Sequence, residues 1–137
     1  MENKKLIPPF DMETAAEKLQ VIENAWNAFD PERVSALYTT DTEWRDRTEF
    51  VHGRGNVKAY LTQEWEKELG FKIKKELWGA KEHRMAVRFE YEWHDRNGQW
   101  YHSYGVEVME FDPAGLVRMR FASISDLAIG SNERQFS

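Results

Sequence analysis

The sequence predicts a single α+β domain, because its first half shows helical periodicity and its second half shows strand periodicity. A chain of 137 residues has room for one domain of ordinary size. From Phe71 onward apolar and polar residues alternate, and clusters of turn residues separate the runs. An antiparallel sheet built from such strands has one face to cover, and the predicted helices are the elements available to cover it.

Three helices are predicted before residue 71. The first begins at a capping signal, Asp11 or Thr14, and its apolar residues recur at steps of three and four up to about Phe29. Asp30-Pro31 starts a short second helix, because Asp caps a helix well and Pro suits its first position. A third helix occupies residues 53–70, where glycines mark both ends.

The predicted strands are short and joined by turns. The turn sequences at residues 95–98 and 112–115 predict hairpins. The strands themselves are predicted at residues 42–47, from 71 to about 77, 85–94, 100–111 and 116–125. We expect one domain over residues 11–127, with an extended N-terminal arm at residues 1–10 and a flexible C-terminal tail at residues 128–137.

Composition excludes several classes of protein. The charge of −5 argues against nucleic-acid binding, and the absence of Cys excludes disulfides, thiolate metal sites and a Cys nucleophile. No apolar run is long enough for a signal peptide or a membrane span, so we expect a cytoplasmic protein that does not contact a membrane. No nucleotide-binding motif is present, and no cofactor is expected. The 19 aromatic residues, in contrast, indicate a need for broad apolar surface.

Short peptides spread over nearly all of residues 8–127 resemble a known group of proteins. They are Pro8-Pro9-Phe10, Ala25-Trp26-Asn27, Asp30-Pro31, Trp44-Arg45-Asp46-Arg47, Lys75-Glu76-Leu77-Trp78, Ala86-Val87-Arg88-Phe89, Tyr91-Glu92-Trp93-His94-Asp95, Ser103-Tyr104-Gly105, Glu110-Phe111-Asp112 and Ala122-Ser123-Ile124-Ser125-Asp126. The sequence is similar to the nuclear transport factor 2-like superfamily, and within it to a SnoaL-like family of unknown function. This resemblance implies a cone, in which a curved antiparallel sheet wraps about three helices around a deep pocket. The fold hosts isomerases, cyclases, dehydratases, epoxide hydrolases and non-enzymatic binders, so the resemblance does not decide whether the chain is an enzyme.

Two carboxylates are candidate acid–base residues, because burial in an apolar pocket raises a carboxyl pKa toward neutrality. Asp126 ends the last predicted strand, where the resemblance to SnoaL-like cyclases implies a catalytic Asp. Its alternative role is an ion pair with an Arg. Asp46 lies two residues after Trp44 and therefore on the same strand face, although the flanking Arg45 and Arg47 favour a simple ion pair.

The register of the hairpin that joins residues 85–94 to 100–111 decides which other polar residues face the pocket. A two-residue loop at Asn97-Gly98 pairs Tyr91 with Tyr104 and makes His102 and Tyr104 pocket candidates. A type I turn with a glycine bulge instead places Glu107 on the apolar face. The sequence leaves both registers open, because a slip of one residue exchanges the faces.

The leading hypothesis is a cofactor-free pocket for a small hydrophobic or aromatic molecule, with Trp44 and Tyr91 among its walls. Asp126 or Asp46 would act as the base, and Tyr104 or His102 would donate a hydrogen bond to a developing oxyanion. Isomerisation, dehydration and cyclisation all fit this scheme. A ligand-binding module without catalysis and a dimeric structural domain are the alternatives.

The outer face of the sheet is expected to be polar with scattered aromatic residues, and a homodimer is expected to bury it. Arg118 and Arg120 are assigned to this face, opposite Met119 and Phe121. A metal site is not expected. Potential ligands on the neighbouring strands lack a compact His spacing; they are Glu92, His94, His102 and Glu107.

Overall fold

A computed structural model of the protein, described here for residues 6–136, contains three α-helices and six strands. The helices are α1 (Met12–Asn27), α2 (Pro31–Ser35) and α3 (Arg54–Lys67). The strands are β1 (Tyr38–Asp46), β2 (Glu49–His52), β3 (Leu69–Lys81), β4 (Arg84–His94), β5 (Trp100–Phe111) and β6 (Val117–Ile129), followed by a 3₁₀ turn at Ser131–Glu133. No helix within residues 6–136 is long and apolar enough to cross a membrane.

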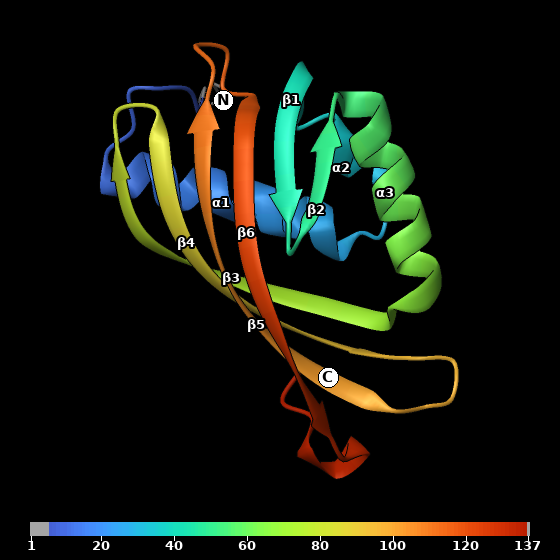
Figure 1. Ribbon diagram of the computed structural model, residues 1–137. Helices are drawn as coiled ribbons and strands as arrows, with labels where there is room; N and C mark the ends of the chain where they lie inside the picture. Colours follow the sequence, from blue (N-terminus) through green and yellow to red (C-terminus); the bar gives the residue numbers. More distant parts are fainter. Residues whose placement is uncertain (1–5, 137) are drawn as a thin grey trace.

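The six strands form one curved, unclosed sheet in the order β2-β1-β6-β5-β4-β3. Neighbouring strands are antiparallel except for β1 and β6, which run parallel. Helix α1 crosses behind the strands, and α3 stands beside β2 at one edge of the sheet (Figure 1). The predicted α+β cone is therefore confirmed. The sequence missed β2, a four-residue strand that folds back on β1 and is mostly exposed.

The concave face of the sheet and the helices enclose the core. Helix α1 contributes its buried stripe of Ala15, Leu19, Ile22 and Trp26, as the spacing predicts. Strand β4 contributes every second side chain from Met85 to Tyr91, and the polar residues between them point outward; the buried ones are Met85, Val87, Phe89 and Tyr91. These alternating faces give the cone an aromatic interior.

Polar side chains of α1 attach the helix to the edge strand β3. The Asn27 amide donates to the Ile73 carbonyl at 2.9 Å and accepts from the Ile73 N–H at 2.9 Å. The Lys75 N–H donates to the Glu23 carboxylate at 2.6 Å. These bonds use backbone groups that an edge strand would leave unpaired, and they fix α1 against the β3 edge of the sheet.

Both ends of the described chain are bonded to the domain. Residues 1–5 of the predicted arm and residue 137 of the predicted tail lie outside the described residues. Phe10 is buried against Phe111, and its N–H donates to the Glu82 carbonyl at 2.7 Å. At the other end β6 continues to Ile129, and the N–H groups of Gln135 and Phe136 donate to the Glu92 carboxylate at 2.9 and 2.8 Å. The boundaries expected at residues 10 and 128 thus do not mark a loss of contact with the domain.

The β4–β5 hairpin adopts the second of the two predicted registers. Gly98 has a φ of +84°, Val87 pairs with Glu107 and Tyr91 pairs with Ser103. Glu107 therefore points into the cone. His102 and Tyr104 lie on the outer face, so their prediction as pocket residues is corrected by this register.

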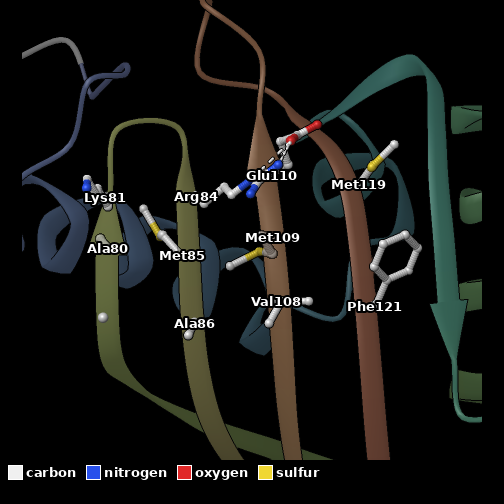
Figure 2. Close-up of a pocket in the computed structure, with 11 residues that line it drawn as sticks. Ala80, Lys81, Arg84, Met85, Ala86, Val108, Met109, Glu110, Met119 and Phe121 are labelled. Atoms are coloured by element: carbon white, nitrogen blue, oxygen red, sulfur yellow. Dashed lines mark hydrogen bonds and ion pairs between the residues drawn. The ribbon is translucent and has the colours of Figure 1, made fainter.

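The outer face carries an apolar groove of about 510 Å³ along β3 to β6 (Figure 2). Ala86, Val108, Met119 and Phe121 line it, and Lys81, Arg84 and Glu110 lie at its rim. Val108 is 53% exposed. An apolar groove flanked by charges of both signs is a feature of surfaces that bind another protein.

Candidate functional site

The interior of the cone contains a small cavity between the sheet, α1 and α3. Its lining is mostly aromatic or aliphatic and includes four carboxylate or guanidinium side chains; the residues are Trp26, Trp44, Asp46, Tyr60, Leu61, Glu64, Trp65, Glu68, Phe71, Ile73, Phe89, Tyr91, Arg120 and Ile124. The free volume is about 30 Å³. This is roughly the volume of one water molecule, so a larger ligand needs the half-buried side chains of α3 to move.

Arg120 lies at the centre of the cavity floor. Its guanidinium carbon is 4.5 Å from the Trp44 ring centroid and 5.1 Å from that of Trp26, and the two indole rings are stacked. The side chain is only 2% exposed. The assignment of Arg120 to the outer face was wrong, because Met119 and Phe121 line the outer groove and place Arg120 on the inner parity.

Four charged side chains form a continuous buried charge chain, which we define as Lys75, Glu107, Arg120 and Asp46. Lys75 Nζ contacts one Glu107 oxygen at 2.5 Å, and Arg120 Nε contacts the other at 3.0 Å. Arg120 then reaches Asp46 at 3.3 Å. Two cations alternate with two anions, so the four side chains of the buried charge chain sum to zero charge. Each of them has a partner of the opposite sign.

The electrostatics of this chain follow from burial and pairing. Burial alone would raise the pKa of Glu107, but the adjacent charges of Lys75 and Arg120 outweigh it and lower that pKa. Burial lowers the pKa of Lys75, and the Glu107 carboxylate opposes this effect. Glu107 therefore stays ionised, and each of its two oxygens contacts one cationic side chain.

Asp46 connects the buried charge chain to the cavity. One of its oxygens faces Arg120, and the other accepts a hydrogen bond from the Tyr60 hydroxyl at 2.8 Å. Burial, followed by the charge of Asp46, raises the pKa of Tyr60 far above its usual value, so the phenol stays protonated and donates. Single contacts from Arg120 and Tyr60 orient the carboxylate and leave it lone pairs for a ligand.

Helix α3 and its C-terminal cap residue add two carboxyl groups, Glu64 and Glu68, which we call the α3 carboxyls. They lie one helical turn apart on the cavity side of the helix. Burial raises both pKa values, and for Glu68 burial together with the nearby Glu64 charge raises the pKa to about 8. No residue among 6–136 gives the Glu68 carboxyl a hydrogen bond or an ion pair.

Asp126 lies at the mouth of the cone rather than at the cavity. Its carboxylate accepts from Arg47 at 2.7 Å and from the Ser103 hydroxyl at 2.5 Å. The same Arg47 donates to the Tyr91 hydroxyl at 3.1 Å. Asp126 is thus in the ion pair that the sequence left open as its alternative role, about 32% exposed, and the pair braces Tyr91 in the cavity wall.

His102 forms a second polar cluster on the outer face. Its ring nitrogens lie 2.9 Å from Glu92 and 2.6 Å from Glu90, and the rings of Tyr104 and Phe136 cover it. The tail therefore closes over a buried histidine between two carboxylates. Within residues 6–136, no group of three or more His, Asp or Glu side chains is placed to hold a metal ion.

The structure thus brings Trp44, Asp46 and Tyr91 together around one cavity, and Arg120 links Asp46 to Glu107 in the buried charge chain. Sequence reasoning missed Glu68. The signal was present, because Glu68 continues the apolar helical face of Val57, Leu61 and Trp65 at a spacing of three. A carboxylate on the apolar stripe of a helix points to a buried acid.

Comparison with known proteins identifies the family. A family model described as "Protein of unknown function (DUF1348)" matches residues 8–137. The chain belongs to the DUF1348 family. No curated protein is similar to it in sequence.

Solved structures place this DUF1348 protein among nuclear transport factor 2-like folds. The epoxide hydrolase/cyclase-like enzyme SalBIII matches with a TM-score of 0.73 at 17% identity, over 84% of this chain and 93% of that one. RV0760c from Mycobacterium tuberculosis, solved with estradiol-17beta-hemisuccinate, matches with a TM-score of 0.69 at 16% identity over 81% and 97%. An NTF2-like protein of unknown function from Exiguobacterium sp. 255-15 matches with a TM-score of 0.65 at 13% identity over 79% and 98%. At these identities the likeness establishes the fold.

Proposed function

We propose that this protein binds a small, largely apolar molecule in the cone and transfers protons on it without a cofactor. The observation that carries the proposal is Asp46, a carboxylate oriented by Tyr60 and Arg120 beside an aromatic cavity. Such a carboxylate can remove a proton from carbon, as isomerisation, dehydration and cyclisation require. Asp126, the other candidate base, is assigned to holding Arg47 at the mouth.

The fold neighbours support a small-molecule ligand. One is described as an epoxide hydrolase/cyclase-like enzyme, and another was solved with a steroid ester. The cavity of this chain is far smaller than such molecules, so a ligand enters as Trp65 and the α3 carboxyls give way. These side chains are half-buried and belong to a helix that buries just Val57 and Leu61 fully.

A thermal-shift screen of small aromatic and alicyclic carbonyl compounds tests this function. A ligand should raise the melting temperature of the natural protein, and Asp46→Asn should abolish its turnover. Asp41→Asn makes the same change on the exposed side of β1 and should leave turnover intact. Stabilisation without turnover in any variant would support the alternative, a binding module without catalysis. The absence of any stabilising compound would count against both.

A homodimer is a second proposal, favoured by the groove on the outer face. We propose that a second copy of the chain packs on it, because its floor is apolar and Val108 is 53% exposed there, whereas the rim charges Arg84 and Glu110 already pair with each other at 3.2 Å. Val108→Glu should convert a dimer to a monomer in analytical ultracentrifugation, and Val21→Glu, which changes a 45% exposed valine on α1, should not. A natural protein that sediments as a monomer would contradict the proposal.

A further inference from the structure

Glu64 and Glu68 are the two cavity carboxyls that no hydrogen bond or ion pair within residues 6–136 uses. Glu68 is half-buried at the C-terminal cap of α3, where it lines the same cavity as Asp46. Asp46 is bonded to Arg120 and Tyr60, whereas Glu68 has no bonding partner within residues 6–136. A carboxyl that bonds no neighbouring residue contributes no contact that holds the fold, so it is free to bond a molecule in the cavity.

Building on the function proposed above, we propose that Glu68 is the acid of the cavity. It supplies the proton that an oxygen atom of the bound molecule receives, while Asp46 accepts the proton that leaves carbon. The ligand class is then a neutral, apolar molecule with a carbonyl oxygen near an acidic C–H bond.

The surroundings of Glu68 support this role. The charged and titratable groups that face it are Glu64 of α3, Asp46 of β1, Arg47 just after β1, Tyr91 of β4 and Asp126 of β6. Three are carboxylates and one is a guanidinium, which also bonds Asp126. Burial and the charge of Glu64 raise the pKa of Glu68 to about 8, so the group is mainly a neutral donor at pH 7. A neutral carboxyl donor and a carboxylate that pairs with Arg120 form an acid–base pair in one cavity.

The proton transfer balances without a further reactant. The C–H bond breaks, its proton bonds to an Asp46 oxygen, and its electron pair becomes a C=C bond. The carbonyl oxygen takes the proton of Glu68, which becomes a carboxylate. Asp46 loses the negative charge that Glu68 gains, so the total charge of the site stays constant. Where the new C=C bond is conjugated with a second C=C bond of the ligand, return of the enol O–H proton to Glu68 and of the Asp46 proton to the far carbon completes an isomerisation.

Labelling with N,N′-diisopropylcarbodiimide tests the proposal on the whole chain and needs no known substrate. This apolar reagent adds to protonated carboxyls: its central carbon bonds to the carboxyl oxygen, the acid proton moves to nitrogen, and an acyl shift leaves a stable N-acylurea. Peptide mass spectrometry should find the label on Glu68 at pH 7. The labelling rate should fall roughly tenfold between pH 7 and pH 9, since the protonated fraction falls by that factor around a pKa near 8.

Matched variants and competitors make the result specific. Glu68→Gln should remove the label, and Glu66→Gln, on the exposed side of α3, should retain it. Acetophenone should protect Glu68 at least fivefold better than ethylbenzene, which has the same ring and no oxygen.

Three results would overturn the proposal: no label on Glu68 at pH 7, a labelling rate that does not change up to pH 9, or equal protection by both compounds. Binding and Asp46-dependent turnover of a ligand with no label on Glu68 would overturn this inference alone. Labelled Glu68 in a protein that no compound stabilises would instead count against the proposed function.

Discussion

The buried charge chain and the α3 carboxyls lie on two sides of one cavity and are built in opposite ways. In the buried charge chain every charge has an opposite partner within 3.3 Å, and Glu107 is bonded by two cations. At the end of α3, Glu68 is half-buried and has no hydrogen-bond or ion-pair partner within residues 6–136. The same residue type thus has its pKa lowered on one side and raised on the other.

This difference separates what holds the cone together from what is available for chemistry. A buried pair with good geometry offsets the cost of removing its charges from water, so its residues are committed to structure. An unpaired buried carboxyl stays neutral and reactive at the expense of stability. Asp46 belongs to both sides, because it ends the buried charge chain and lines the cavity.

The largest predicted effect comes from breaking the buried charge chain at Glu107. Glu107→Gln removes the negative charge between Lys75 and Arg120, which leaves Arg120 with Asp46 and leaves Lys75 without its ion-pair partner. We expect the free energy of unfolding to fall by about 3 kcal/mol or more, measured by urea denaturation with tryptophan fluorescence.

A double variant separates lost charge from lost packing. Adding Lys75→Met to Glu107→Gln removes the cation that lost its partner while keeping a long apolar side chain beside Trp26 and Phe89. The double variant should be more stable than Glu107→Gln alone, which is a positive coupling between the two sites. If Glu107→Gln unfolds at the same urea concentration as the natural protein, the buried charge chain contributes little to the free energy of unfolding.

The second prediction concerns the pH dependence that Glu68 imposes on stability. Its pKa is about 8 in the folded protein and 4.5 without the fold, so the folded state binds the extra proton between these values. Stability should therefore decline as the pH rises from about 4.5 to about 8, and Glu68→Gln should remove this part of the decline. Because the group lies near the open mouth, we expect a difference on the order of 2 kcal/mol between the two proteins' losses from pH 5 to pH 8.

Urea denaturation at pH 5, 6, 7 and 8 measures this difference. Glu66→Gln makes the same charge change on the exposed side of α3 and serves as the control. If the curves of the natural protein and Glu68→Gln run parallel from pH 5 to pH 8, the carboxyl of Glu68 is ionised throughout this range, and the contrast with Glu107 disappears.

The fold was predictable because local and global signals agree. Helical spacing in α1, the Asp30-Pro31 start of α2 and the strict alternation of β4 each predict the observed element. Strand β2 was missed because it has four mostly exposed residues and its stability comes from pairing with β1. The parallel pairing of β1 and β6 joins segments more than 70 residues apart, and no local pattern contains that information.

The site was predictable only where strand parity was unambiguous. Asp46 follows Trp44 by two residues, and both line the cavity. Glu107 depended on a hairpin bulge of one residue, which the sequence left open. Arg120 was misplaced because apolar Met119 and Phe121 suggest a core face, whereas they line the outer groove. A sequence pattern predicts that apolar residues face the core and charged residues face solvent. This strand does the opposite, because Arg120 lies in the interior and its apolar neighbours line a groove on the outer face.

The smallest predicted effect is at Asp126, and it decides which carboxylate is the base. Its ion pair with Arg47 is about one-third exposed on both sides, so Asp126→Asn should lower the free energy of unfolding by less than about 1 kcal/mol. Arg47 keeps its bonds to the Tyr91 hydroxyl and the Ile124 carbonyl in this variant, so the cavity wall should stay in place. A ligand found by thermal shift should bind Asp126→Asn as it binds the natural protein and should still be turned over, whereas Asp46→Asn should bind without turnover. The opposite pattern, with turnover lost in Asp126→Asn and kept in Asp46→Asn, would move the base from the cavity floor to the mouth of the cone.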